Sequence, residues 1–194
     1  MRATILPAAL LLFGLAACSS TGSLDYTPTG TVAPSPAASV SAVVATDQRD
    51  EKPNRLATVR GGYGNPVYVL DTPQPVTDQV AAAFTKALQA RGMMGSSSAP
   101  YRIGLALRTF YGNKYVSRTA YIDLDLIVAD RTGRTIYKDA IKDERSEFLL
   151  FDADIVGLQK LVQALLNATI DRMLDKPGLR AVLEGRPPQG PPGS

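Results

Sequence analysis

The sequence predicts an α+β fold in which an antiparallel sheet of about five strands is covered on one face by two main helices, in the order β-β-α-β-β-β-α. Residues 101–108 and 119–128 alternate apolar with polar side chains, which is typical of half-buried antiparallel strands. Residues 80–88 and 155–173 repeat apolar side chains three and four positions apart, which is the spacing of an amphipathic helix. Sequences rich in glycine, asparagine and aspartate separate these segments and predict turns.

The first half of the expected domain contains two short strands and one helix. Residues 40–45 are small or β-branched and predict the first strand, and residues 67–70 predict the second. Thr77 or Asp78 can cap the helix, and Gly92 is suited to end it because glycine readily adopts positive φ. The apolar face of this helix consists of Val80, Phe84, Ala87 and Leu88.

The two alternating segments are expected to form a hairpin. Residues 112–113 are Gly-Asn, which suits a two-residue turn that requires positive φ. This turn sets Ile103 opposite Ile122 on the apolar face. The same register places Arg102 opposite Asp123 on the polar face, so the hairpin is consistent in both apolar pairing and charge.

The last third of the expected domain contains one strand and one long helix. Residues 134–142 mix polar and apolar side chains on both faces, which is typical of an edge strand. Asp152 or Asp154 can cap the helix at residues 155–173, because a carboxylate accepts hydrogen bonds from free backbone N–H groups. A short helical turn is expected at residues 177–183.

The N-terminal residues are typical of a secretory signal peptide. The apolar stretch at residues 5–17 is shorter than the roughly 20 residues that a membrane-spanning helix needs. Residues 15–18, Leu-Ala-Ala-Cys, resemble the bacterial lipobox. The resemblance implies cleavage before Cys18, a diacylglyceryl thioether on its sulfur and N-acylation with a fatty acid such as palmitate. Ser19, in place of aspartate, favours the outer membrane over the inner membrane by the same resemblance.

Composition divides the chain into four parts. Residues 1–17 are the expected lipoprotein signal peptide, and residues 18–38 are the expected lipidated cysteine with a flexible tether. The tether prediction rests on a composition of Ser, Thr, Gly, Pro and Ala, which buries too little apolar surface to offset the entropy of ordering. Residues 39–184 are the expected α+β domain. Residues 185–194 are rich in Pro and Gly and are expected to be disordered.

The residue counts exclude several classes of protein. The chain contains no histidine, so it cannot form a catalytic Ser-His-Asp or Cys-His arrangement. Its single cysteine allows no disulfide within the chain, and the usual zinc ligands are missing. The net charge of +3 is far below that of a typical nucleic-acid-binding protein. We therefore expect a protein that is not an enzyme, holds no metal or cofactor and binds no nucleic acid.

Two groups of polar residues are candidate sites. The basic loop contains Arg49, Arg55 and Arg60 near a Gly-rich sequence that includes Tyr63. These four residues are expected either to form a solvated loop or to bind lipid phosphates, peptidoglycan carboxylates or an acidic protein surface. The second group is the pair Asp123 and Asp125, which could act in glycoside hydrolysis. Pairing with Arg102 and Arg108 across the strands is a simpler explanation.

Several features occur together in one order along the chain. They are the lipobox with Cys18, residues 47–49, the helix ending at residues 90–92, the alternating strand at residues 120–128, Gly133, and a C-terminal helix with Asn167, Ile170 and Met173. In this order the chain resembles the YajG-like family of uncharacterised bacterial lipoproteins over most of residues 40–184. It departs from that family in the basic loop and the Pro-rich tail. The resemblance implies a lipid-anchored periplasmic α+β domain without an assigned activity. In topology alone the chain is similar to auxiliary lipoproteins of envelope lipid-transport systems.

We interpret the chain as a non-enzymatic, membrane-anchored envelope lipoprotein that binds another envelope component through its basic Gly-rich loop or its sheet edge. Its expected location is the outer membrane, facing the periplasm. Its expected partners are the membrane, through the lipid anchor, and an envelope protein or lipid. The alternative function is an auxiliary lipid or small-ligand carrier of an envelope transport system, which the broad apolar stripe at residues 155–173 suggests.

Overall fold

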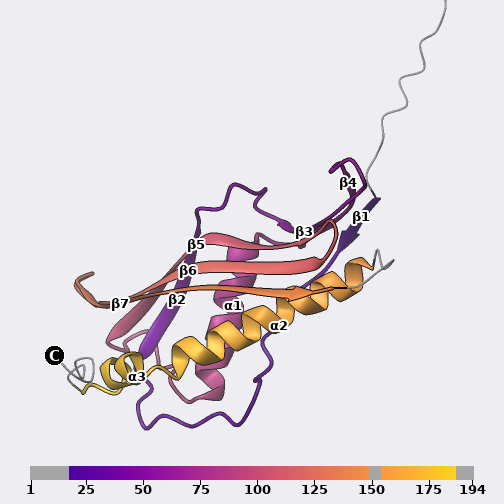
Figure 1. The fold of residues 1–194 in the computed structure, drawn as a ribbon. Coiled ribbons are helices and arrows are strands. Elements are labelled where there is room, and N and C mark those ends of the chain that lie inside the picture. Colours follow the sequence, from indigo (N-terminus) through magenta and orange to yellow (C-terminus); the bar gives the residue numbers. More distant parts are fainter. Residues whose placement is uncertain (1–17, 149–153, 187–194) are drawn as a thin grey trace, which may run out of the picture.

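The computed structural model describes residues 18–148 and 154–186. The expected signal peptide at residues 1–17, most of the expected disordered tail and the candidate cap Asp152 lie outside the described residues. Within these residues the chain forms one open seven-stranded sheet and three helices (Figure 1). The α+β class is therefore confirmed. The sheet has more strands than expected and is mixed rather than antiparallel.

The elements follow in the order β1 (Cys18–Thr21), β2 (Val40–Asp47), β3 (Arg55–Arg60), β4 (Pro66–Asp71), α1 (Val76–Ala90), β5 (Tyr101–Lys114), β6 (Arg118–Asp130), β7 (Thr135–Glu147), α2 (Ile155–Leu174) and α3 (Pro177–Leu183). In space the strands run β1-β4-β3-β5-β6-β7, and β2 also pairs with β5. Among the described residues, no helix combines the length and apolar character needed to cross a bilayer.

The mixed character of the sheet comes from its N-terminal strands. Strands β5, β6 and β7 form the expected antiparallel run, whereas β2 and β3 pair with β5 in parallel, and β1 pairs with β4 in parallel. Strand β2 follows residues 101–107 of β5, and β3 follows residues 112–114 of the same strand. The expectation of an antiparallel sheet is thus wrong because two short strands run one after the other along one side of β5.

Two of the seven strands were not expected. Strand β3 lies inside the expected basic loop, where Leu56, Ala57 and Val59 are buried between flanking arginines. Strand β1 lies inside the expected tether. Both segments are short, and neither carries a polar-apolar alternation long enough to indicate a strand.

The expected register of the β5–β6 hairpin is wrong. The turn lies at residues 115–117, and Ile103 pairs with Val128 rather than with Ile122. Arg102 therefore faces Ala129 instead of Asp123. The displacement of six residues is even, so it leaves the same side chains on the apolar face. This is why the inward face was predicted correctly although the pairing was not, and Ile103, Ile122 and Val128 are all buried.

Gly112 lies inside β5 and not in a turn. A Cβ atom at this position would lie 2.7 Å from Cγ2 of Val162 and 3.0 Å from Cδ1 of Leu158, both on α2. The glycine is therefore required for the close approach of the helix to the sheet. An irregularity between Leu107 and Thr109 shifts the inward positions of β5, so that Phe110 and Gly112 face the helix.

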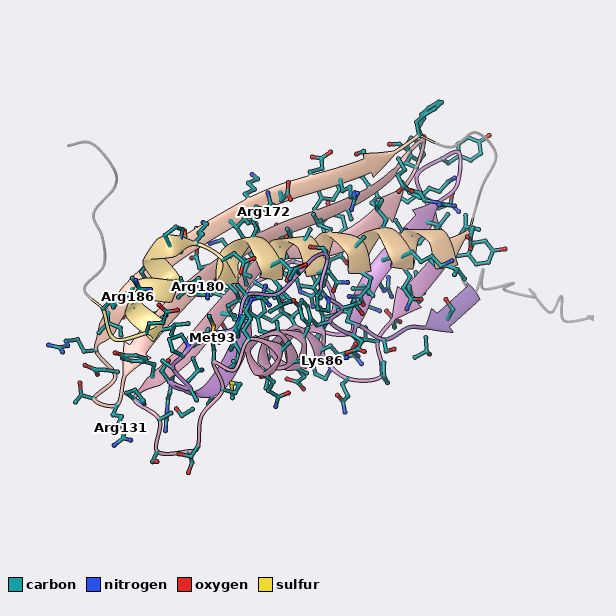
Figure 2. All side chains as sticks on the ribbon, turned by 90° about the horizontal axis from the view of Figure 1, so that it is seen from below. Lys86, Met93, Arg131, Arg172, Arg180 and Arg186 are labelled. Atoms are coloured by element: carbon teal, nitrogen blue, oxygen red, sulfur yellow. The ribbon has the colours of Figure 1, made fainter. Side chains whose placement is uncertain are left out.

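The helices begin and end close to the expected residues. Helix α1 starts at Val76 after Pro75, so the predicted cap at Thr77 or Asp78 is wrong: both residues lie in the first turn of the helix, and no side chain caps it. Gly92 follows the helix with a φ of 68°. Asp154 caps α2 through bonds from the backbone N–H groups of Val156 and Gly157, at 2.8 and 2.9 Å. Both helices pack on one face of the sheet (Figures 1 and 2), where their apolar side chains and those of the strands form one core.

The buried face of β6 provides a test of the core. Leu124 is fully buried, so Leu124→Ala should lower the free energy of unfolding by about 2–5 kcal/mol through lost apolar burial and a residual cavity. The matched control is Val44→Ala at an exposed position, which should change it by less than about 0.5 kcal/mol. Urea unfolding measures both values. A loss below about 1 kcal/mol for Leu124→Ala would contradict the assignment of the inward face.

Candidate functional site

The segment after Cys18 packs on the domain instead of forming the expected flexible tether. The backbone of Cys18 pairs with Tyr68 of β4, and this pairing continues to Thr21 opposite Asp71. The N–H of Gly22 then donates to the carbonyl of Asp71 at 3.0 Å. The first described residue of the chain is thus already part of the sheet.

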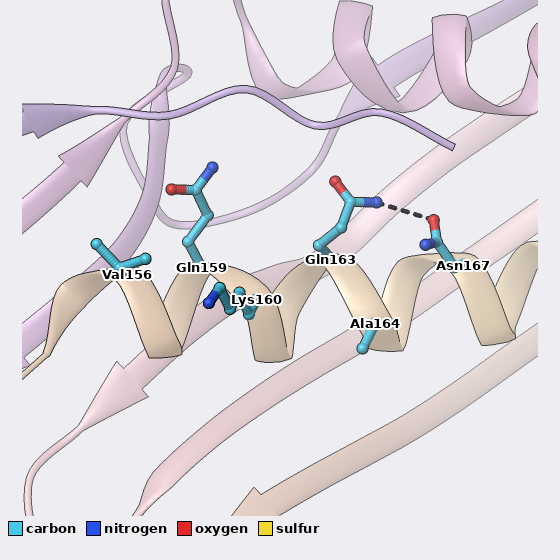
Figure 3. A pocket seen from close by; sticks show the side chains of 6 residues that line it. All are labelled: Val156, Gln159, Lys160, Gln163, Ala164 and Asn167. Atoms are coloured by element: carbon cyan, nitrogen blue, oxygen red, sulfur yellow. Dashed lines mark hydrogen bonds between the residues drawn. The ribbon is translucent and has the colours of Figure 1, made fainter. Parts of the chain in front are cut away.

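Residues 22–29, here called the strap, lie along α2. Four polar side chains at four-residue intervals on the helix bond the backbone of alternate strap residues. Figure 3 shows three of them, Gln159, Gln163 and Asn167, on one side of α2. The pairs are Gln159 with Ser23 (3.2 Å), Gln163 with Asp25 (2.9 Å), Asn167 with Thr27 (3.5 Å) and Asp171 with Thr29 (2.8 Å). Four helical residues rise about 6 Å and two extended residues about 6.6 Å. The spacing of the polar side chains along α2 therefore matches the spacing of alternate residues along the extended strap, so each of these side chains can bond one strap residue.

The intervening strap residues face the core. Leu24 and Tyr26 are buried, at 8% and 1% exposure, and the N–H of Leu24 donates to Oε1 of Gln79 on α1 at 2.6 Å. Composition alone failed to predict this packing because Ser, Thr, Gly and Pro dominate the segment. The available signal was the alternation of these two apolar side chains with polar neighbours.

Arg91 joins the strap to both long helices. Its side chain is only 1% exposed, and it lies directly after α1. The guanidinium donates to the hydroxyl of Tyr26 and to Oδ1 of Asp171, both at 2.9 Å, and it lies 3.4 Å from Asp175. The hydroxyl of Tyr26 also donates to Asp171. A buried cation is stable only when it is paired in this way.

The ionised form of Asp171 is favoured in this cluster. Burial alone would raise the pKa of its carboxyl group. The hydrogen bonds that it accepts from the strap and from Arg91 outweigh burial, so the pKa lies below its ordinary value of 3.8. Burial is also the largest cause that raises the pKa of Tyr26, followed by its hydrogen bond to Asp171.

Arg49 of the basic loop is directed into the protein. Its side chain is 1% exposed, and it pairs with the carboxylate of Asp47 at 2.8 Å. It also donates to the carbonyls of Arg55, Phe110 and Pro53 at 2.9–3.2 Å. These carbonyls lie where β2 has ended and β3 begins, so Arg49 satisfies backbone acceptors at the interruption of the sheet. Its guanidinium is not available to a partner.

The other three candidate residues of the basic loop separate into two groups. Arg55 pairs with Asp71 at 2.6 Å across β3 and β4 and is mostly buried. Arg60 is exposed and donates to the carbonyl of Gly64 and to Oδ1 of Asn113. Tyr63 is fully exposed at the tip of the β3–β4 turn, where Gly64 adopts a φ of 78°. Only Arg60 and Tyr63 are therefore presented to solvent together.

The face of β5–β7 away from the helices contains a shallow trough. No helix of the described part of the chain covers this face (Figure 1). Two hollows of about 330 and 270 Å³ meet at Thr109. Tyr111 and Tyr121 lie in the trough with ring centroids 5.1 Å apart. Its other lining side chains include Arg49, Asp50, Glu51, Arg108, Asp123, Lys142 and Glu144.

Asp123 and Asp125 are paired with an arginine across the strands, as the sequence suggested. Arg108 contacts Asp125 and lies 3.8 Å from Asp123. Arg102 does not take part, because the actual register places it near the end of β6. Within the described residues, no three His, Cys, Asp or Glu side chains group closely enough to hold a metal ion.

A family model described as an uncharacterised lipoprotein matches residues 31–184. This match agrees with the resemblance to the YajG-like lipoproteins. A search of curated proteins finds no match.

Solved structures share the fold at low sequence identity. Protein XCC0632 from Xanthomonas campestris, assigned to family DUF330, is 16% identical, with a TM-score of 0.55 over 86% of this chain and 96% of that one. A second structure, described as an uncharacterised protein, is 9% identical, with a TM-score of 0.54 over 86% of this chain and 99% of that one. At such identities the likeness shows the fold alone.

The strap provides a test with a defined pH dependence. Asp171→Asn removes the charge that pairs with Arg91 and should lower the free energy of unfolding by about 3 kcal/mol at pH 7. Because the pKa of Asp171 is lower in the folded state than its ordinary 3.8, the carboxylate stabilises the fold above that pH. The difference between wild type and variant should stay constant from pH 5 to pH 7, values well above that pKa, and shrink as the pH falls below 3.8.

The matched control for this prediction is Asp25→Asn, on the strap itself. Asp25 pairs with Lys86 at 2.7 Å, but its side chain is 71% exposed. Its loss should change the free energy of unfolding by less than about 1 kcal/mol. Equal effects of the two substitutions, measured by urea unfolding, would contradict the role assigned to Asp171.

Proposed function

Because this chain belongs to the family of uncharacterised lipoproteins whose model matches residues 31–184, we propose that it is a non-enzymatic lipoprotein anchored in the cell envelope, which binds a second envelope protein across the trough of its open sheet face. The proposed location is the outer membrane, with the domain facing the periplasm. The family supports lipid anchoring as such. Ser19 after the cysteine is the feature that favours the outer membrane.

The proposed anchor is a set of acyl chains on Cys18. Leu15, Ala16 and Ala17 precede this cysteine in the order of a lipobox, and the chain contains no other cysteine. Several acyl chains hold a protein stably on a bilayer, whereas a single chain gives only marginal binding.

The observation that supports partner binding is the chemistry of the trough. Tyrosine and arginine are enriched at protein interfaces, and the trough contains Tyr111, Tyr121 and Arg108 side by side with carboxylates. Charges of both signs, from Lys142 and Glu144 among others, suit another polypeptide better than a uniformly anionic polymer. The binding surface proposed here lies beside the basic loop and includes the edge strand β7.

We further propose that the protein has no enzymatic role. This proposal is supported by the lack of histidine in the sequence and by the pairing of Asp123 and Asp125 with Arg108. The carrier role draws no support from α2, because the apolar stripe that suggested it is directed into the core, with Leu158, Leu165 and Ile170 buried.

Site-specific crosslinking tests the proposed binding surface. A photo-crosslinking amino acid is placed at Lys142, which lines the trough, in the lipidated full-length chain in its native cells. We expect one discrete crosslinked product, with a yield that falls about tenfold in the Tyr111→Ala background because an aromatic contact is lost. The matched control is the same amino acid at Lys160, an exposed residue of α2 on the helical side (Figure 3).

Two outcomes would contradict the proposal. Equal crosslinking from Lys142 and Lys160, or none from Lys142, would remove the trough as a partner-binding surface.

A second variant, Cys18→Ser, separates anchoring from binding: the protein should stay folded and appear in the soluble fraction. Membrane-bound Cys18→Ser protein would contradict the anchor.

A further inference from the structure

Exposed apolar and aromatic side chains gather at one end of the molecule. Among the described residues, six of the eight exposed large apolar side chains lie there. They are Tyr63, Val67, Tyr68, Tyr115, Val116 and Phe148, and this group is here called the aromatic end. Tyr63 is fully exposed, and Val116 and Phe148 are about two-thirds exposed, at 65% and 67%. Side chains of this kind are costly to leave in water when they are clustered.

Strand pairing brings these residues together from three connections. Strand β3 pairs Val59 with Lys114, which places the β3–β4 turn beside the β5–β6 turn. The hydroxyl of Tyr115 donates to the carbonyl of Gly62 at 2.9 Å and joins the two turns directly. Arg118 pairs with Glu147, so Phe148 follows β7 next to the β5–β6 turn.

The cysteine of the proposed anchor lies at this same end. The backbone of Cys18 pairs with Tyr68, and neighbouring strands are about 4.8 Å apart. The strap then holds the following residues on α2. No slack chain therefore separates a lipid on Cys18 from the aromatic end, and acyl chains inserted in a leaflet would bring these side chains to its surface.

The opposite end of the molecule has a different chemistry. Arg131, Arg180 and Arg186 lie there (Figure 2), and Arg134 in the β6–β7 turn is 79% exposed. Arg134 pairs with Asp130, and Arg180 and Arg186 pair with Glu184, so this end presents paired charges instead of apolar side chains. The two ends thus differ in a way that suits a fixed orientation, with the aromatic end toward the bilayer.

We propose that the aromatic end is a membrane-contact surface, whose tyrosine and phenylalanine side chains insert into the headgroup region of the leaflet that holds the protein's own acyl chains. Tyrosine favours this region because its ring is apolar and its hydroxyl is polar. Arg60, exposed beside Tyr63, is placed to pair with lipid phosphate. The proposal rests on the lipid at Cys18 and adds to it a defined orientation of the domain.

Tryptophan fluorescence tests the proposal, because the natural chain contains no tryptophan. Tyr63→Trp places a reporter at the aromatic end, and the matched variant Arg131→Trp places one in an exposed turn at the other end. Both full-length chains are purified in lipidated form and reconstituted into phosphatidylcholine vesicles with brominated acyl chains, which quench nearby tryptophan.

We expect the Tyr63→Trp emission to shift to shorter wavelength and to lose about half of its intensity, because side chains in the interface lie within about 5–10 Å of the acyl boundary. The Arg131→Trp emission should be the same in brominated and ordinary vesicles. Both substitutions are at exposed turn positions and should leave the fold intact.

Flotation of the vesicles distinguishes the possible failures. Protein that floats while the tryptophan at position 63 stays unquenched would contradict the membrane contact and leave the anchor in place. Protein that does not float would contradict the anchor and the membrane contact together. Quenching at both positions would contradict the assigned orientation. An emission at position 63 that changes only when envelope proteins are added would assign this end to a protein partner and overturn the proposal.

Discussion

The buried guanidinium of Arg91 is the interaction on which the arrangement of this protein depends. It joins α1, α2 and the strap through the Tyr26 hydroxyl and the Asp171 carboxylate. A paired charge in the interior adds little net stability, but removal of one partner leaves the other charge buried and unpaired. The ion pair therefore specifies where the strap lies. The composition of the segment after Cys18 is typical of a flexible linker, and this segment is held on the domain by contacts such as the ion pair.

The position of the strap connects the anchor with the two surfaces of the domain. A free tether of about 20 residues would let the domain move roughly 25 Å from a membrane and rotate without restriction. With the strap held on α2, the cysteine, the aromatic end and the sheet belong to one body. A lipid at Cys18 would then define an orientation, and the trough on the open face would be presented to the side of the molecule rather than toward the bilayer. Anchoring and partner binding can in this way use different surfaces at the same time.

Local patterns in the sequence predicted the inward faces, the cap at Asp154 and the helix end at Gly92, because each depends on a few neighbouring residues. Register was not predictable, since alternation defines pairing only to within an even number of residues, as the displaced partner of Ile103 shows. The site was predictable only in part. Tyr63 and Arg60 are exposed, as a binding loop requires. Arg49 instead donates to backbone carbonyls at a break in the sheet, and no local pattern in the sequence reveals that break. The strap depends on contacts more than 130 residues apart in sequence, which composition cannot indicate.

Amide hydrogen exchange of the strap measures most directly whether this segment is held on the domain. The N–H groups of Asp25 and Thr29 donate to Gln163 and Asp171 at 2.9 and 2.8 Å. In the lipidated protein at neutral pH, these two amides should exchange on the order of 100-fold more slowly than in an unstructured peptide, because they open only when the strap leaves the helix. Exchange at the rate of an unstructured peptide would show a loose tether and contradict the account.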